Sequence, residues 1–237
     1  MASARAREQP RPEHEIKLVT PAARAATVSA WLAGRCPPDP KYPTGLVTSI
    51  YYDNRDAELL RAKINSDFIK YKVRARWYGD PRSGAVLEPA FIELKRKVGG
   101  RRFKTRLPLD VPAAQIAAAR PSTLLLRRLL AGLREQGHWA GADLQPFLRI
   151  GFRRHRFIEP TTGSRISVDF DIRGCSVNPA LLPQSNPAAL AHAVIEVKGP
   201  AAELPRRLAW LRDMGCQPDS FSKYARCFLK ITRRSSF

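Results

Sequence analysis

The feature that most constrains the fold of this sequence is the stretch at residues 70–78, in which basic side chains alternate with apolar and aromatic ones. Successive side chains of a β-strand point to opposite faces, so a strand here carries its cations on one face and its apolar groups on the other. The cations are Lys70, Lys72, Arg74 and Arg76. Taken alone, this pattern also fits an ordinary half-buried strand with a solvated face.

The same alternation recurs at residues 92–98, 102–107, 165–171 and 195–198. Several strands with one charged and one apolar face suit an antiparallel barrel whose charged faces point inward and whose outer faces are covered by helices. We therefore predict an α+β fold in which an antiparallel β-barrel, flanked by helices, encloses a charged tunnel. A tunnel lined by Lys and Arg, with a few carboxylates, is suited to binding a polyanion.

Turn and capping residues predict the remaining elements. Hairpin turns are expected at Gly99-Gly100 and at Thr161-Thr162-Gly163. Further strands are expected at residues 13–19, 46–52 and 193–198, and helices at 20–33, 54–64, 111–119, 122–136 and 203–214, followed by a last helix. Thr20-Pro21 is expected to begin the first helix, Asp53 or Asn54 to cap the second, and Asp219 or Ser220 to cap the last.

Composition narrows the class of protein. The 237 residues include 41 Lys plus Arg and 21 Asp plus Glu, a formal net charge of +20, which indicates an anionic partner. The four cysteines are scattered without metal-binding spacing, so we expect free thiols. Neither a signal peptide nor an apolar run of the ~20 residues that a membrane span needs is present. We expect a cytoplasmic protein with a disordered leader at 1–12, one domain at 13–231 and a tail at 232–237.

The sequence lacks the common phosphate-binding and catalytic motifs. It contains no GxxxxGK[ST], no GxGxxG and no protein-kinase set, and its four histidines form no catalytic arrangement. What remains is an excess of cations with carboxylates at strand positions, the composition that phosphoryl transfer requires. Glu196 and Lys198 place a metal ligand and a phosphate ligand on one strand face. The same pair also fits a surface ion pair.

Six short motifs, in this order, resemble the VTC domain, the catalytic domain of vacuolar transporter chaperone polyphosphate polymerases. They are Glu15-Ile16-Lys17, Ser49-Ile50-Tyr51-Tyr52-Asp53, Lys72-Val73-Arg74-Ala75-Arg76-Trp77-Tyr78, Glu93-Leu94-Lys95-Arg96-Lys97, Ile195-Glu196-Val197-Lys198 and Ser222-Lys223-Tyr224. That domain belongs to the triphosphate tunnel metalloenzymes, or CYTH-like superfamily, which are marked by an ExExK strand. Glu13-His14-Glu15-Ile16-Lys17 is similar to that strand.

The resemblance implies a set of site residues. Lys17, Arg74, Arg76, Lys95 and Lys198 would be catalytic, Lys104, Arg154, Arg165 and Lys223 would bind phosphate, and Glu196 would hold Mn²⁺ or Mg²⁺. Only the resemblance singles out Lys223. The family pattern favours Arg154, whereas simple alternation from Arg149 favours Arg153, and a bulge would reconcile the two.

The resemblance also implies an activity, the transfer of the γ-phosphate of ATP to a growing polyphosphate chain, with ATP and polyphosphate as the partners. Hydrolysis of tripolyphosphate or a nucleoside triphosphate would use the same ligands. Binding of polyphosphate or RNA without turnover is the third hypothesis. The alternation argues against nucleic acid, because it sends Tyr71, Trp77 and Phe103 to the face opposite most cations. A membrane partner that carries the polymer away is compatible with the sequence.

Overall fold

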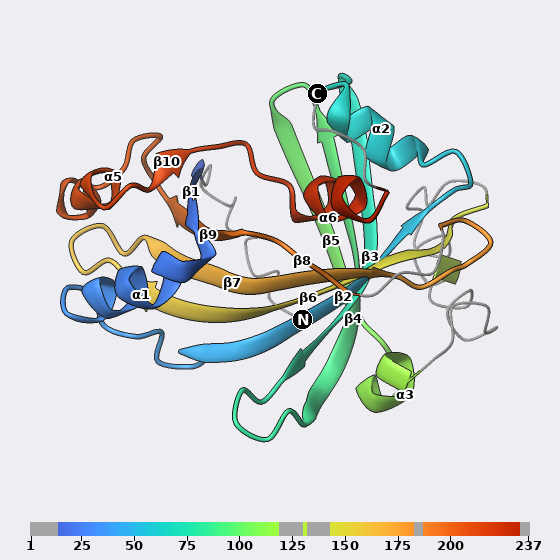
Figure 1. Ribbon diagram of the computed structural model, residues 1–237, viewed down its shortest axis with the longest axis horizontal. Helices are drawn as coiled ribbons and strands as arrows, with labels where there is room; N and C mark the ends of the chain where they lie inside the picture. Colours follow the sequence, from blue (N-terminus) through green and yellow to red (C-terminus); the bar gives the residue numbers. More distant parts are fainter. Residues whose placement is uncertain (1–13, 119–129, 132–142, 183–186, 233–237) are drawn as a thin grey trace, which may run out of the picture.

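Long antiparallel strands dominate the computed structural model, which describes residues 14–118, 130–131, 143–182 and 187–232. All of the strands belong to one sheet in the order β10-β1-β9-β7-β6-β2-β3-β4-β5, with β8 paired to β7 (Figure 1). The strands are β1 (His14–Pro21), β2 (Thr44–Asp53), β3 (Ile69–Gly79), β4 (Val86–Val98), β5 (Arg101–Pro108), β6 (Gln145–Ile158), β7 (Arg165–Ser176), β8 (Ala188–Ala189), β9 (His192–Gly199) and β10 (Gln217–Pro218).

The sheet curls but does not close. Its ends, β10 with β1 on one side and β5 on the other, are not joined by backbone hydrogen bonds within the described residues. The edge of β1 that would complete a barrel is partly occupied, because Leu18 and Val19 pair with β10. An ion pair instead crosses the gap, with Arg102 Nη1 of β5 lying 3.6 Å from Glu15 Oε2 of β1. The predicted antiparallel α+β fold is confirmed, whereas the predicted closure into a barrel is not observed.

The outer face of the curled sheet is apolar, as the alternation predicts. Beside β2, β3 and β4, Val73, Ala75 and Ile92 join a buried cluster that includes residues of α3 (Ala113–Ala118). Beside β1, β7 and β9, the outer-face residues pack with α1 (Ala25–Ala33) and with α5 (Trp210–Asp213). Helices therefore cover this face at two separate places (Figure 1).

The inner face is divided between an apolar part and a charged part. Over the apolar part lies α6 (Lys223–Ile231), whose Tyr224 and Phe228 rings pack against Phe147 of β6 in a cluster with neighbouring strand residues. The short helix α2 (Glu58–Ile64) adds Leu60 to the same cluster. The rest of the inner face carries the charged side chains described below. The apolar part of the inner face is therefore the part that α6 and α2 cover.

Where the structure describes them, helical segments lie within the predicted helical ranges, but several of the predicted ends are wrong. β1 continues to Pro21, so the first helix starts as a 3-10 turn, Ala22–Arg24, and not at Thr20-Pro21. The expected helix at 203–214 is reduced to a 3-10 turn, Arg206–Leu208, and the single turn of α5. Ser222, rather than Asp219 or Ser220, caps α6, because its hydroxyl accepts a hydrogen bond from the backbone N–H of Ala225.

Both predicted hairpins are confirmed. Val98 pairs with Arg101 across Gly99-Gly100, and Ile158 pairs with Arg165 across the second turn. Gly99 has φ +54° and leaves room for the ring of Phe68, which an added Cβ would meet at 2.9 Å. The leader, most of the helix expected at 122–136 and residues 233–237 of the tail lie outside the described residues. No helix within the described ranges is long and apolar enough to cross a membrane.

Candidate functional site: three carboxylate-centred groups of cations

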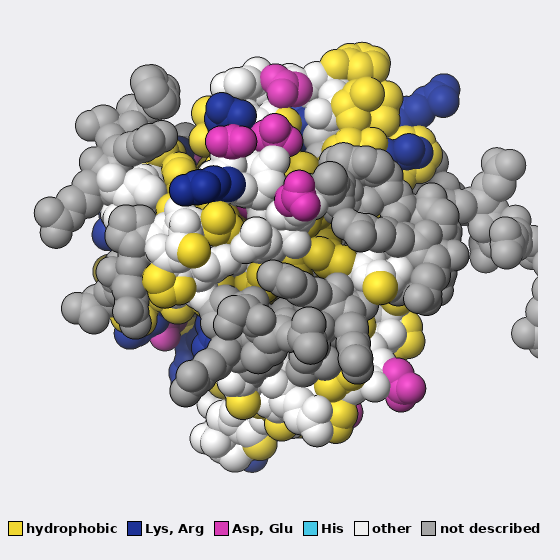
Figure 2. Space-filling model, turned by 90° about the vertical axis from the view of Figure 1, so that its right-hand side faces the viewer, with side chains coloured by type: hydrophobic (Ala, Val, Ile, Leu, Met, Phe, Trp, Pro, Cys, Tyr) yellow, Lys and Arg dark blue, Asp and Glu magenta, His cyan; other side chains and the backbone are white. Residues whose placement is uncertain are grey.

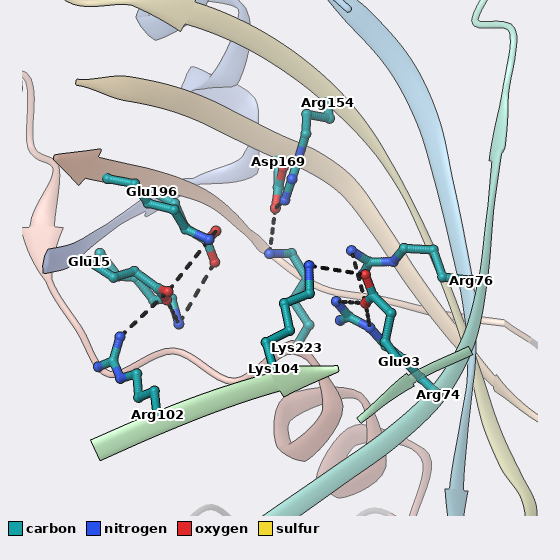
Figure 3. Close-up of polar contacts among 12 residues, drawn as sticks. Glu15, Arg74, Arg76, Glu93, Arg102, Lys104, Arg154, Asp169, Glu196 and Lys223 are labelled. Atoms are coloured by element: carbon teal, nitrogen blue, oxygen red, sulfur yellow. Dashed lines mark hydrogen bonds and ion pairs between the residues drawn. The ribbon is translucent and has the colours of Figure 1, made fainter. Parts of the chain in front are cut away.

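Among the residues that the structure describes, four carboxylates of the inner face have nine basic side chains around them, most of which are drawn in Figure 3. They form three groups, which we call the Glu93 group, the Asp169 group and the Glu15–Glu196 group. The strands bring these groups together from positions far apart in the sequence. Each strand contributes by the same alternation that sends its apolar residues outward.

The Glu93 group has a buried carboxylate at its centre. Glu93 is 1% exposed and accepts a hydrogen bond from Arg74 Nε at 2.7 Å. Around it lie Lys104 Nζ at 3.3 Å, Arg106 Nε at 3.6 Å and Arg76 Nη1 at 4.0 Å. Burial alone would raise the pKa of Glu93, but the positive charges of Arg74, Arg76 and Lys104 hold it well below its usual range. Glu93 is therefore ionised and fixes the guanidinium groups.

Residues of β2 hold the outer sides of these guanidinium groups. Arg74 Nη1 donates a hydrogen bond to the Tyr51 hydroxyl at 3.0 Å, and Arg76 Nε donates to Ser49 Oγ at 2.9 Å. Burial would raise the pKa of the Tyr51 hydroxyl, yet the charges of Arg74 and Lys72 lower it to about 8. The positive charges of this group therefore outweigh the nearby carboxylate and also stabilise the ionised form of the Tyr51 hydroxyl.

The Asp169 group joins the sheet to α6. Asp169 is fully buried, and its two oxygens accept hydrogen bonds from Arg154 at 2.5 and 2.6 Å. Lys223 Nζ, at the start of α6, lies 2.6 Å from Asp169 Oδ2. Burial would raise the pKa of Asp169, but the charges of Arg154 and Lys223 lower it. This bidentate contact fixes Arg154 in one orientation.

The Glu15–Glu196 group lies on the adjacent strands β1 and β9. Lys17 Nζ is 2.6 Å from Glu15 Oε1 and 3.7 Å from Glu196 Oε1. Lys198 Nζ is 3.6 Å from Glu15 Oε2 and 3.9 Å from Glu196 Oε2. Burial would raise the pKa of Glu196, but the charges of Lys223, Arg154, Lys198 and Lys17 bring it far below its usual range. Both carboxylates are anionic at neutral pH.

Two more lysines of the inner face, Lys95 and Lys72, have lowered pKa values because they are buried among other positive charges. The pKa of Lys95 is lowered to about 6, chiefly by burial and then by the charges of Arg74 and Lys198. The pKa of Lys72 is lowered to about 8, again chiefly by burial. Bound anionic groups would favour the charged forms of both lysines. The inner face is thus suited to a ligand with several negative charges.

Within the described part of this face, one pair of carboxylates, Glu15 and Glu196, has the chemistry that a divalent metal ion would require. Among the described residues, no three His, Cys, Asp or Glu side chains converge as a metal site. Mg²⁺, however, is usually held by one or two carboxylates together with substrate phosphates and water. Glu15 and Glu196 fit that requirement, since both are ionised, share Lys17 and Lys198 as neighbours and belong to paired strands. Glu93 and Asp169 are instead almost completely buried, with 1% and 0% of their side chains exposed against 19% and 14% for Glu15 and Glu196.

The structure brings together nearly all of the predicted site residues. Lys17, Arg74, Arg76, Lys95, Lys104, Arg154, Lys198, Lys223 and Glu196 take part in these three groups or in their electrostatics. Arg165 is exposed at the start of β7, where its cross-strand neighbour is Lys198. It lies at the margin of the site.

The choice between Arg153 and Arg154 is settled by the direction of Arg149. Arg149 points outward, where its Nη2 donates a hydrogen bond to the carbonyl of Ala117 in α3. Counting by two from an outward residue makes Arg153 an outward residue, and Arg153 is exposed. Arg154 therefore faces inward without a bulge in this part of β6. The nearby irregularity lies in β7, where Asp171 has φ +50°.

Sequence reasoning missed the carboxylates that orient the cations. The alternation set Glu93 on the face of Lys95 and set Asp169 on the charged face of its strand, but neither was predicted to be a site residue. Their partners come from other strands, and cross-strand register decides which carboxylate meets which guanidinium. Tyr51 and Lys72 were missed as site residues for the same reason.

These features define a class: a curled antiparallel sheet whose inner face presents an excess of cations around a few carboxylates. The sequence matches the VTC domain family over residues 12–231, and the chain belongs to that family. No functionally curated protein matches the sequence.

Two solved structures are similar in fold. The PH1819 protein of Pyrococcus horikoshii OT3 is 13% identical, with a TM-score of 0.53 over 92% of this chain and 99% of that chain. A "putative adenylate cyclase" from Bacillus halodurans is 14% identical, with a TM-score of 0.53 over 91% and 98% of the two chains. At these identities the likeness concerns the fold.

Proposed function

We propose that this protein is a metal-dependent phosphotransferase that transfers the γ-phosphate of ATP to the end of a growing polyphosphate chain. The observation that carries the proposal is the inner face of a VTC-domain fold on which nine basic side chains surround four carboxylates. Phosphoryl transfer depends mainly on positioning and on stabilising the charge of the phosphoryl oxygens. Fixed guanidinium and ammonium groups supply both.

The residues divide into two roles in this proposal. Lys17, Arg74, Arg76, Lys95 and Lys198 contact the transferring phosphoryl group, and Lys104, Arg154, Arg165 and Lys223 bind the flanking phosphates. Glu93 and Asp169 act through them, as positioning residues that hold Arg74 and Arg154. A terminal phosphate oxygen of the chain attacks the γ-phosphorus, a new P–O bond forms, and the bond from the γ-phosphorus to the bridging oxygen of ADP breaks. No protein nucleophile is required.

Glu196, with Glu15 beside it, would hold Mn²⁺ or Mg²⁺. When bound, such an ion supplies positive charge that orients phosphate oxygens and offsets the charge that develops on them. The low pKa of Glu196 supports this assignment, because a metal ligand must be deprotonated. The other ligands would be phosphate oxygens and water.

The activity is tested with purified protein, ATP and Mn²⁺, followed by gel staining for polyphosphate and by an assay for released phosphate. We expect long polymer to form and little free phosphate. Lys198→Ala should abolish most of the polymer, whereas Arg212→Ala, which removes an exposed cation of α5, should not. Free phosphate without polymer would identify a triphosphate hydrolase, and binding without turnover would identify a binding module; either result would reject the polymerase.

A further inference from the structure

The register of β3, β4 and β5 arranges their inner-face residues in cross-strand rows. The row nearest the buried centre consists of Arg74, Glu93 and Arg106. The next row, which we call the middle row, consists of Lys72, Lys95 and Lys104, and the one beyond it, the distal row, of Lys70, Lys97 and Arg102. The middle and distal rows contain six cations and no carboxylate.

This arrangement is unfavourable in the protein alone. Like charges directly opposite each other on adjacent strands destabilise a sheet, and here two consecutive rows consist of them. Lys63 of α2 adds a further cation to the distal row. Lys63 is half-buried near the end of α2, the helix that leads into β3. Its pKa is lowered by burial and then by the charges of Lys70, Lys17 and Lys97, and Asp219 opposes this more weakly.

The distal row also lacks the partners that the other groups have. Over the residues that the structure describes, no ion pair joins Lys63, Lys70 or Lys97 to an acidic side chain. Arg102 alone has one, at 3.6 Å from Glu15 across the gap in the sheet. That ion pair makes the distal row face the Glu15–Glu196 group and not the outer surface.

The surroundings of the distal row are only partly solvated. Lys63, Lys70 and Lys97 are half-buried, and the exposed ring of Phe68 lies beside Gly99 at the turn of the same β4–β5 hairpin. Figure 2, which views the molecule from the right-hand side of Figure 1, shows hydrophobic side chains beside Lys and Arg side chains at the top of the molecule, the end where Figure 1 places α2. Cations in such surroundings attract an anion more strongly than fully solvated ones.

We propose that the distal row, with Lys63, is a separate binding subsite for a further anionic segment of a linear polyphosphate chain. The proposal rests on the proposed function, because it assigns the direction in which the chain leaves the phosphates bound at the Glu93 group. Two residues of a strand advance by about 6.6–6.8 Å. A chain that occupies the middle row reaches the distal row by continuing that far along the strands, toward α2.

The test compares binding of tripolyphosphate and of long-chain polyphosphate at fixed ionic strength, measured by calorimetry and so without turnover. The test variant is Lys70→Ala/Lys97→Ala. The matched control is Arg96→Ala/Arg101→Ala, which removes two cations from the same hairpin but from its outer face, since Arg96 and Arg101 alternate with the inner residues. Thermal melts of both variants verify that they are folded.

We expect the test variant to lose at least about tenfold in affinity for long chains, as the loss of one charge-assisted hydrogen bond would give, and to keep its affinity for tripolyphosphate. The control should bind both ligands like the wild type. Equal losses for the two ligands, equal losses in test and control variants, or a larger loss for single-stranded RNA than for polyphosphate would each overturn the subsite. If the wild type binds no polyphosphate of any length, the proposed function fails together with it. If it binds both ligands and the test variant is unchanged, only the subsite fails.

Discussion

Two buried carboxylates orient three of the cations of this site. Glu93 holds Arg74, and Asp169 holds Arg154 and Lys223, in each case with at least one contact of 2.7 Å or less. Removing one partner of a buried ion pair leaves an uncompensated charge and costs about 3–5 kcal/mol. Mutation of Glu93 or Asp169 is therefore expected to destabilise the fold, so that a loss of activity could not be assigned to the reaction itself. Glu196, which is still partly exposed, is the better probe of mechanism.

Glu196→Gln is expected to reduce turnover strongly, by about 100-fold, without weakening ATP binding. The exchange removes a negative charge from among Lys17, Lys198, Lys223 and Arg154, so ground-state attraction for phosphate should be kept or increased. If Glu196 holds the metal, the Mn²⁺ concentration at half-maximal rate should also rise by at least about tenfold. The measurement is turnover as a function of Mn²⁺, with ATP binding determined separately.

Glu203→Gln is the control, because Glu203 is an exposed carboxylate away from the site. An unchanged Mn²⁺ dependence in Glu196→Gln would mean that the carboxylate only balances the charge of its neighbours. The metal assignment would then be wrong even if turnover fell.

The alternation in the sequence could predict the face of each strand residue but not its partner. Lys17, Arg74, Lys95 and Glu196 lie on the predicted face because period-two geometry leaves no other choice once one face is apolar. Arg154 could not be assigned in the same way, since that required knowing that Arg149 contacts α3. The partners of Glu93 and Asp169 lie on neighbouring strands, so they depend on the register between strands, which the pattern of a single strand does not reveal.

Asp53 joins three elements that support the site. Its carboxylate, at the end of β2, accepts hydrogen bonds from the N–H groups of Leu59 and Leu60 at the start of α2, each at 3.0 Å. It also accepts one from the Tyr224 hydroxyl of α6 at 2.7 Å. Tyr224 in turn stacks on Tyr51, with ring centroids 4.7 Å apart, and directly follows Lys223 in α6. Asp53 therefore sets the position of α6 on the inner face.

Asp53→Asn is expected to destabilise the protein by about 1–3 kcal/mol, because one carbonyl oxygen cannot replace two carboxylate oxygens and the new NH₂ group faces existing donors. Tyr224→Phe removes a single hydrogen bond and keeps the stacking on Tyr51, so it should cost less, about 0.5–1.5 kcal/mol. Urea denaturation of the two variants measures both free energies of unfolding. A smaller loss for Asp53→Asn than for Tyr224→Phe would contradict the role of Asp53 at the start of α2.

The long strands could be predicted from the sequence, whereas the short helices and strands could not. The strands and the two hairpin turns follow from alternation and glycine positions. The short pieces did not follow, because Thr20-Pro21 and residues 203–214 carry local helix signals that are overridden by pairing of β1 with β9 and by packing of Leu208 and Leu211. The prediction that the sheet closes was wrong, because the sequence pattern did not reveal that the edge of β1 pairs in part with the two-residue strand β10.

The whole molecule carries a net charge of +20. Concentrating part of that charge on the inner face opposes folding in the absence of an anion. Lys95 reports this directly: its pKa is about 6 in the folded protein against 10.5 when unperturbed. Between these two values the unfolded chain binds more protons than the folded one. The contribution of Lys95 to stability therefore rises with pH from about 6 to about 10.5 and is most unfavourable below pH 6.

An anion bound beside Lys95 should reverse this protonation. With phosphates near, the charged ammonium is favoured, so binding of tripolyphosphate at pH 7.5 should take up protons, and affinity should fall as pH rises above about 6. Calorimetry in two buffers of different ionisation enthalpy measures the number of protons taken up. Lys95→Met, which retains an unbranched apolar chain without the charge, should take up about one proton fewer than the wild type. Lys72, whose pKa is about 8, accounts for only a smaller part at this pH because it is already mostly protonated. Equal proton uptake by the wild type and Lys95→Met would show that Lys95 already carries its proton in the free protein. The pKa of Lys95 would then not be lowered, and the positive charges of the inner face would be compensated without a bound anion.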